Sequence, residues 1–326
     1  MYTSFDRPAL VLFHMPDAPE IRRIAGWCRP WDGQWPQEEG FLVVPFHGQG
    51  VWINRVCDYI CLPLEGGEEV NSASYTEAFP LFHQAVEEGR FQKIVLSHSF
   101  ESREVKVSHF WNLCKKFPHS FAYLLDTPPT GMWMGATPEA LLYGEGKEWH
   151  TMALAGTKTS PEEPWDEKNL REQAMVGNFI RQTLEKHVPE VQESERYTIQ
   201  SGDLYHLRTD FDFQITENEE LPALLRDLHP TPAVCGLPQK EARKFILDHE
   251  GYKRRLYTGY LGPVNYSAFG TYLAVNIRCA QFLSEERSLL YAGSGLMPDS
   301  TLESEWAEVK RKSESLLGLD LFEDDK

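Results

Sequence analysis

Residues 122–150 have the sequence AYLLDTPPTGMWMGATPEALLYGEGKEWH. Four short segments in this stretch, at 122–125, 131–135, 141–143 and 148–150, are typical of strands, and Pro, Gly or charged residues separate them. Short segments joined by such tight turns predict neighbouring antiparallel strands. The segment Gly144–Lys147, GEGK, lacks the spacing of a phosphate-binding loop, so we interpret it as the turn of a hairpin.

Strands and separate helices continue on both sides of this stretch. Further strands are predicted at 41–46, 51–53, 93–97, 257–262, 272–278 and 289–293. Apolar residues at helical spacing predict helices at 75–88, 165–187 and 239–250, and a last helix has Ser300 as its N-cap, with Glu303 completing a capping box. This order predicts an α+β fold in which large, mostly antiparallel β-sheets carry the helices on their outside.

The chain has 326 residues, with 32 Lys and Arg against 49 Asp and Glu, so its formal net charge is −17. This acidic balance argues against binding of nucleic acid or an anionic membrane, because phosphate contacts need clustered basic side chains. No run of 18 apolar residues and no signal peptide is evident, so we expect a cytoplasmic protein. The six cysteines form no CxxC pair, and we expect buried free thiols rather than disulfides or zinc ligands.

The pattern changes along the chain and divides it into three regions. Residues 1–73 are expected to form a β-rich N-terminal segment that is integral to the fold, with a solvated connection at 62–71. Residues 74–318, where helices and strands follow one another, are expected to form the main core, and residues 319–326 an acidic tail.

Acidic residues on two predicted helices are candidate metal ligands. Glu305 and Glu308 are three residues apart and share one helix face, and Lys312 lies four residues beyond Glu308. This pattern fits a solvated face with an ion pair, or a carboxylate pair that binds a hard cation such as Mg²⁺. Glu172 lies beside the apolar stripe of the helix at 165–187, where it either faces solvent or supplies a further carboxylate.

Three more residues could carry chemistry. Lys93 begins an apolar strand, where a lysine ordinarily reaches solvent, although a buried neutral lysine can act as a general base. Glu139 follows a turn proline and is either an ordinary turn residue or an acid whose proton is retained by an apolar pocket. Arg278 ends an apolar strand, which predicts a buried carboxylate partner.

In their joint arrangement, residues 74–318 resemble the chorismate-utilising enzymes, which include isochorismate synthases, salicylate synthases and the large subunits of anthranilate and aminodeoxychorismate synthases. The matching blocks are Lys93–Ser97, Gly135–Glu139, Ala155–Thr157, Glu172 on its helix, His229–Val234, Tyr257–Gly259, Ile277–Arg278 and Ala292–Lys312. Ala233 stands where the anthranilate and salicylate branches typically have Thr, so the block at 229–234 is most similar to that of the isochorismate synthases.

The resemblance implies the chorismate-binding fold, with residues 74–318 as its catalytic core, and an isomerase that converts chorismate to isochorismate. It implies Lys93 as the base that activates water and Glu139 as the acid that protonates the leaving hydroxyl. The implied ligands of Mg²⁺ are Glu172, Glu305 and Glu308. The implied substrate-binding residues are Gly156, Thr157, Ala233, Tyr257, Arg278, Gly293 and Gly295.

Alternatives remain within the resemblance. A salicylate synthase would add pyruvate elimination to isochorismate formation, and a non-catalytic protein would bind chorismate without turnover. Three positions depart from the family pattern beside the proposed site, namely His98, Gln173 and Arg255. We expect a monomer without a glutaminase subunit, and menaquinone biosynthesis as the pathway that uses the product.

Overall fold

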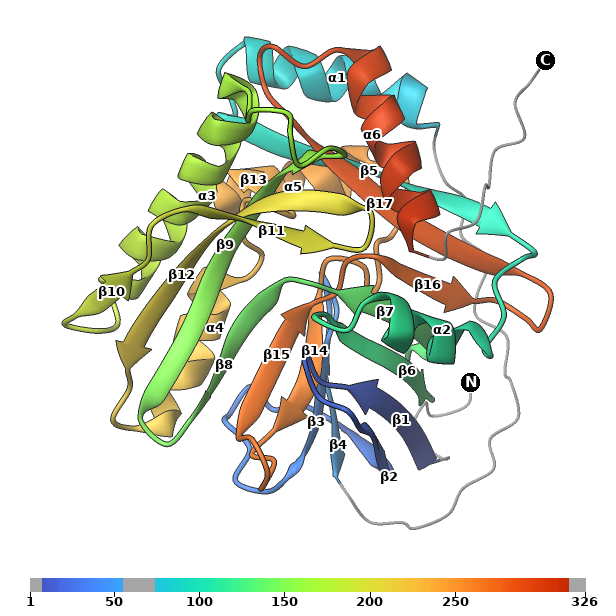
Figure 1. The fold of residues 1–326 in the computed structure, drawn as a ribbon, viewed down its shortest axis with the longest axis vertical. Coiled ribbons are helices and arrows are strands. Elements are labelled where there is room, and N and C mark those ends of the chain that lie inside the picture. Colours follow the sequence, from blue (N-terminus) through green and yellow to red (C-terminus); the bar gives the residue numbers. More distant parts are fainter. Residues whose placement is uncertain (1–7, 55–73, 317–326) are drawn as a thin grey trace.

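The computed structural model describes residues 8–54 and 74–316, which form two antiparallel β-sheets with helices around them (Figure 1). In spatial order, the first sheet consists of β13 (Gly236–Leu237), β5 (Lys93–Ser102), β17 (Ser288–Leu296), β16 (Cys279–Phe282), β7 (Gly131–Thr137), β6 (Phe121–Thr127), β1 (Pro8–His14) and β2 (Ile21–Pro30).

The second sheet begins at the same β2 strand, because the end of β2 leaves β1 and pairs with β4. It continues in spatial order through β4 (Val51–Asn54), β3 (Gly40–Val44), β14 (Tyr260–Val264), β15 (Thr271–Val275), β8 (Ala140–Glu145), β9 (Glu148–Lys158) and β12 (Leu204–Gln214). The short strands β10 (Val191–Glu193) and β11 (Tyr197–Ser201) both pair with the other edge of β12.

Aromatic side chains hold the two sheets against each other. Phe13 of β1 and Phe121 of β6 come from the first sheet, and Phe41 of β3 from the second. The ring centroid of Phe41 lies 5.8 Å from that of Phe13 and 6.5 Å from that of Phe121. Each buried aromatic ring removes a large apolar area from water, and this shared core therefore joins the sheets into one unit.

The helices cover the outer faces of the sheets (Figure 1). Near β5 and β17 lie α1 (Tyr75–Glu87), α5 (Gln239–His249) and α6 (Leu302–Ser315). β9 and β12 are covered by α3 (Glu167–Leu184), which also contacts α4 (Leu221–Leu228), while α2 (His109–Lys116) packs on β6 and β7. A short 3₁₀ helix, Asn218–Glu220, precedes α4. The predicted α+β class, with antiparallel sheets and helices outside, is confirmed.

Most predicted elements appear with shifted ends, and two predictions at the last segments are wrong. β15 ends at Val275, so Arg278 does not end a strand; it lies in a turn with a positive φ of 50°. The N-cap of α6 is Thr301, whose side chain accepts a hydrogen bond from the Ser304 amide. Ser300 instead accepts a hydrogen bond from the amide of Met297 and closes the turn that precedes the helix.

The other expectations are tested only where the structure describes the chain. Cys28, Cys114, Cys235 and Cys279 are buried free thiols, as predicted, whereas Cys57 and Cys61 lie outside the described residues. The segment 62–71 and the tail at 319–326 lie outside them as well, and the division into three regions stays a prediction. Within residues 8–54 and 74–316, none of the helices is long and apolar enough to cross a membrane.

Candidate active site

A pocket of about 730 Å³, its open mouth included, lies between the first sheet, the end of β9, and helices α3 and α6. The pocket brings together predicted site residues from distant parts of the chain, namely Glu139, Gly156, Thr157, Glu172, Ala233, Tyr257, Arg278, Gly293 and Glu308. Three predicted residues, Lys93, Gly295 and Glu305, lie outside this lining. Lys93 contacts Glu172, Gly295 lies against both of these side chains, and Glu305 pairs with Lys168, one helical turn before Glu172.

Lys93 is the first residue of β5, and it is completely buried with 0% exposure. Strand β13 pairs with β5 at this position and covers the strand end that would otherwise meet solvent. The Nζ atom of Lys93 lies 2.7 Å from Oε1 of Glu172. The ordinary interpretation of a lysine that reaches solvent is therefore wrong for this residue.

Glu172 lies on α3 and is 15% exposed, so it does not face open solvent. Burial alone would raise the pKa of Glu172, but the adjacent Lys93 ammonium holds this pKa below its usual value. The start of α3 is fixed by Asp166, whose side chain accepts a hydrogen bond from the amide of Asn169. Asn169 in turn accepts a 3.0 Å hydrogen bond from the amide of Thr157, which joins α3 to the end of β9.

Glu139 lies in the connection between β7 and β8 and is 3% exposed. Its backbone is fixed because its carbonyl accepts a 2.9 Å hydrogen bond from the amide of Val275. Burial raises the pKa of Glu139 to about 8, although Lys93 acts in the opposite direction. The carboxyl group therefore carries its proton at neutral pH and can donate it.

Arg278 projects into the pocket from the turn between β15 and β16, and among the described residues no carboxylate forms the predicted ion pair with it, although Asp203 acts on it electrostatically. Its guanidinium instead donates to the carbonyl and hydroxyl oxygens of Ser201, at 3.1 and 2.7 Å, and to Nε2 of His206. Nδ1 of His206 donates to the carbonyl of Gly156 at 2.8 Å, which fixes the neutral tautomer that accepts from Arg278. Burial and then the Arg278 charge lower the pKa of His206 well below its usual value.

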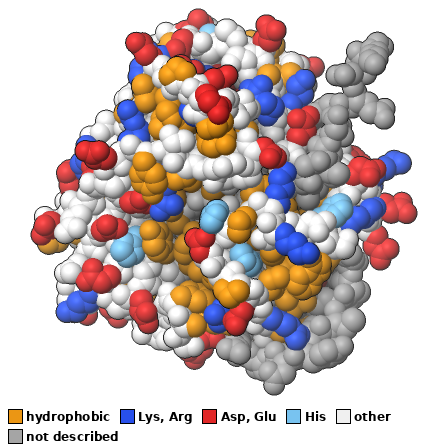
Figure 2. All heavy atoms as spheres, in the orientation of Figure 1, with side chains coloured by type: hydrophobic (Ala, Val, Ile, Leu, Met, Phe, Trp, Pro, Cys, Tyr) orange, Lys and Arg blue, Asp and Glu red, His pale blue; other side chains and the backbone are white. Residues whose placement is uncertain are grey.

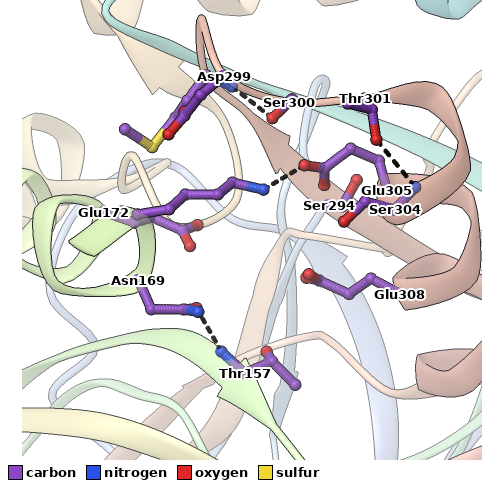
Figure 3. A network of polar contacts seen from close by, with 12 residues as sticks. Thr157, Asn169, Glu172, Ser294, Asp299, Ser300, Thr301, Ser304, Glu305 and Glu308 are labelled. Atoms are coloured by element: carbon purple, nitrogen blue, oxygen red, sulfur yellow. Dashed lines mark hydrogen bonds and ion pairs between the residues drawn. The ribbon is translucent and has the colours of Figure 1, made fainter. Parts of the chain in front are cut away.

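The carboxylates Glu305 and Glu308 of α6 lie opposite Glu172 of α3 (Figure 3). Glu305 is 1% exposed and forms an ion pair with Lys168 of α3, so the prediction of a solvated face is wrong at this position. Glu308 forms the predicted ion pair with Lys312 at 2.6 Å, and Lys312 also donates to the carbonyl of Gly293 at 3.1 Å.

The three carboxylates have the chemistry of a hard-cation site, although each contacts a lysine here. Glu172 contacts Lys93, while Glu305 and Glu308 contact two other lysines. Among residues 8–54 and 74–316, no three acidic, His or Cys side chains form a compact metal-binding group. Oε2 of Glu305 is nevertheless buried without a hydrogen-bond partner, and oxygen donors of this kind are those that Mg²⁺ prefers.

Gly295 of β17 leaves the space that the Lys93 side chain occupies. A Cβ atom at this position would lie 2.3 Å from Cε of Lys93 and 2.7 Å from Oε1 of Glu172. Such distances are far below van der Waals contact, so the ion pair would be displaced. Gly295→Ala is therefore expected to lower kcat by about 100-fold, because a misplaced catalytic group of about 1 Å costs this much.

The matched control for this prediction is Gly177→Ala in the interior of α3, where a Cβ would approach no atom closer than 4.0 Å. This control should keep its activity and gain slight helix stability. Steady-state kinetics with both purified variants decide the matter, and equal activity of the two would contradict the proposed role of the Lys93 position.

A buried network that was not predicted from the sequence contacts the backbone of two residues that line the pocket. Arg254 donates to the carbonyls of Val95 and Val234 at 2.9 and 2.8 Å and pairs with Glu250. Glu250 also accepts hydrogen bonds from the amide and hydroxyl of Ser97. The pair ties β5 to the loop that carries Ala233. Its four-residue spacing is visible in the sequence but resembles an ordinary exposed ion pair.

The three residues that depart from the family pattern lie outside the pocket lining. His98 packs against the ring of Trp306 on α6, with 5.4 Å between the ring centroids. Gln173 is buried and donates a 2.8 Å hydrogen bond to Thr209 of β12. Arg255 lies in the turn before β14 with a positive φ of 53°.

Comparison with known proteins agrees with the geometry. Isochorismate synthase EntC of Escherichia coli (strain K12) is 31% identical over 218 residues, which cover 62% of this chain and 54% of that protein. Isochorismate synthase DhbC of Bacillus subtilis (strain 168) is 29% identical over 256 residues, which cover 71% and 64%. The chain thus spans between about half and two thirds of the length of these curated relatives.

The fold agrees with a solved structure titled as MenF, the menaquinone-specific isochorismate synthase from Escherichia coli. The TM-score is 0.78 at 19% identity, over 95% of this chain and 88% of that one. A family model described as chorismate binding enzyme matches residues 62–319, well over half of the chain. The chain therefore belongs to the chorismate-binding enzyme family.

Proposed function

We propose that the protein is an isochorismate synthase, an isomerase that adds water at C2 of chorismate and removes the hydroxyl at C4. The observation that carries this proposal is the buried Glu139 in the pocket, whose pKa burial raises to about 8, with the fully buried Lys93 near enough to act on it electrostatically. Such a pair supplies the two proton transfers that the reaction needs. The similarity to isochorismate synthases from two bacteria supports the same activity.

The two proton transfers of the proposed reaction balance over one turnover. Lys93 must first release the proton of its ammonium group, and its free amine then takes a proton from the water molecule as the water oxygen bonds to C2 and the ring double bonds shift. Glu139 gives its proton to the C4 oxygen, which leaves as water. Water enters and water leaves, so the overall reaction is an isomerisation, and the proton on Lys93 returns to Glu139 through solvent before the next turnover.

Chorismate is a dianion, and the site offers cations to both of its carboxylates. Arg278 with Tyr257 and the backbone at Gly293 are proposed to bind one carboxylate, while Gly156 and Thr157 shape the ring pocket beside Ala233. Figure 2 shows Asp and Glu side chains scattered over one face of the molecule, with Lys and Arg side chains between them. A divalent cation on the carboxylates, together with Arg278, would make the pocket locally cationic despite the net charge of −17.

The donor set fits Mg²⁺ as the resident cation, held by Glu172 and Glu308 with Glu305 beside them. When bound, the ion would neutralise the second carboxylate of the substrate. The orphaned Oε2 atom of buried Glu305 supports this assignment, because a buried carboxylate oxygen without a donor is costly.

Removal of divalent cations is expected to abolish chorismate turnover, because the second carboxylate of the substrate would then meet the like-charged carboxylates without a cation to bind it. The measurement is the rate of chorismate conversion after EDTA treatment and dialysis, followed by a titration with Mg²⁺. Restoration by Mg²⁺ but not by the same concentration of K⁺ is the predicted result. Full activity of metal-free protein would contradict the metal assignment.

Product identification tests the proposed function itself. Purified protein is incubated with chorismate and Mg²⁺, with and without ammonia, and the products are separated by chromatography. Isochorismate as sole product is expected under both conditions. Salicylate with pyruvate would replace the proposal by salicylate synthase, an aminated product would indicate the ammonia-using branch, and binding without turnover would indicate a non-catalytic protein.

For the setting of the reaction we keep the expectations drawn from the sequence. These are a cytoplasmic monomer that needs no glutaminase subunit and supplies menaquinone biosynthesis. Growth of a menaquinone-requiring strain that lacks its own isochorismate synthase, after introduction of this chain, tests the pathway.

A further inference from the structure

Glu305 is a buried carboxylate with only half of its hydrogen-bonding capacity used. It is 1% exposed, its Oε1 atom contacts the Nζ atom of Lys168, and its Oε2 atom has no partner. A carboxylate this buried is strongly unfavourable without a nearby cation. The ammonium of Lys168 therefore supplies the charge that lets Glu305 stay buried.

Lys168 serves more than this one carboxylate. It lies in the first turn of α3, four residues before Glu172, so the two side chains share one face of the helix. The Lys168 ammonium interacts electrostatically with Glu308 and Glu172 in addition to Glu305. Its charge thus acts on all three candidate metal ligands, Glu172, Glu305 and Glu308, which Figure 3 shows near one another.

Lys168 also differs from the other two lysines in its freedom to move. Lys93 is fully buried, and Lys312 is held by a second hydrogen bond to the backbone of β17. The side chain of Lys168 is 23% exposed, and its long flexible stem can swing into solvent without disturbing α3. Because Glu305 is 1% exposed, Lys168 is the partner of this ion pair that reaches solvent.

We propose that Lys168 is a built-in counter-cation that stabilises the metal-free site and leaves Glu305 when a divalent cation binds. The inference rests on the proposed function, in which these carboxylates hold Mg²⁺. It adds a competition: each binding event must displace the Lys168 ammonium from Glu305, so this residue weakens cation binding while it protects the empty site from charge repulsion.

Binding of Mn²⁺ to the protein without chorismate tests the competition, since the electron paramagnetic resonance signal of free Mn²⁺ reports the bound fraction. Lys168→Met removes the charge and keeps much of the stem, and it should bind Mn²⁺ at least about tenfold more tightly, equivalent to about 1.4 kcal/mol. Lys168→Arg keeps the charge and should bind like the unmodified protein. Lys244→Met removes an exposed lysine that pairs with Asp248 on α5, and it is the matched control with unchanged affinity.

Thermal melting gives a second readout that does not depend on turnover. In EDTA, Lys168→Met should melt several degrees below the unmodified protein, and saturating Mn²⁺ should raise its Tm more than that of the unmodified protein. Equal or weaker Mn²⁺ affinity in Lys168→Met, with normal binding to the unmodified protein, would overturn the competition alone. Absence of Mn²⁺ binding in every variant would overturn the metal assignment and the competition together.

Discussion

Lys93→Met is expected to lower kcat for chorismate conversion by about 10²- to 10⁴-fold, the usual contribution of a general base. The Nζ atom of Lys93, 2.7 Å from Oε1 of Glu172, is the proposed proton acceptor, and a methionine side chain cannot accept a proton from water. The measurement is the initial rate of chorismate loss, compared at equal concentrations of folded protein. A rate within about twofold of the unmodified enzyme would contradict the assignment of the base.

A second variant separates base catalysis from simple charge. Lys93→Arg keeps a positive charge beside Glu172, but the guanidinium does not give up its proton in proteins. We therefore expect Lys93→Arg to be as inactive as Lys93→Met while binding of chorismate is retained in equilibrium titrations. Activity in the arginine variant would mean that the residue acts through its charge alone.

Glu139→Gln is the second substitution with a large expected effect, again about 10²- to 10⁴-fold on kcat. Glutamine has nearly the same shape but no acidic proton, so the C4 hydroxyl would have to leave without protonation.

The stability of Glu139→Gln should not fall. Burial raises the pKa of Glu139 from 4.5 to about 8, so the unfolded chain loses this proton first, and the free energy of unfolding falls as the pH rises between these two values. A neutral glutamine avoids this loss. The Tm of the variant at pH 8 is expected to equal or exceed that of the unmodified protein.

The pH dependence of the unmodified enzyme follows from the same residue. The acid is active while protonated, so the ionisation of Glu139 should make the rate fall above pH 8, by about tenfold per pH unit. Rate measurements between neutral and strongly alkaline pH, with folding monitored by circular dichroism, give this limb. A flat profile well above pH 8, or high activity of Glu139→Gln, would show that another group protonates the leaving hydroxyl.

Local patterns in the sequence were sufficient for the parts of the fold that depend on neighbours in the chain. The hairpins within residues 122–150 and the helix at Tyr75–Glu87 follow from short-range spacing, and both are found. The ion pair of Glu308 with Lys312 is of the same kind, since it spans one helical turn.

Features that depend on distant segments could not be obtained in this way. Lys93 is buried because β13, from far along the chain, covers it, and Lys168 meets Glu305 across 137 residues. The apolar run before Arg278 predicted a strand to its end, but the backbone turns after Val275, and its φ at Arg278 is positive. Strand β12 was not predicted: Arg208, Asp210 and Asp212 alternate with buried residues only over 207–213, and its partner β9 lies far from it in the chain.

The resemblance to a family supplied what spacing alone could not. Glu139 in a turn and Glu172 on a helix each had an ordinary interpretation as exposed acids, and only the ordered blocks joined them into one site. The structure brings both to the same pocket, together with Arg278. Their roles in catalysis remain proposals that the substitutions above address.

Conversion of chorismate in water enriched in oxygen-18, stopped early and analysed by mass spectrometry, tests most directly whether this site activates water. Isochorismate with one oxygen-18 atom per molecule, located at the C2 hydroxyl, is the predicted result, and the remaining chorismate should be unlabelled at this stage. Unlabelled isochorismate would mean that the hydroxyl moves within the substrate and that Lys93 does not act on water. Salicylate with pyruvate, or no product, would contradict the proposed isomerase itself.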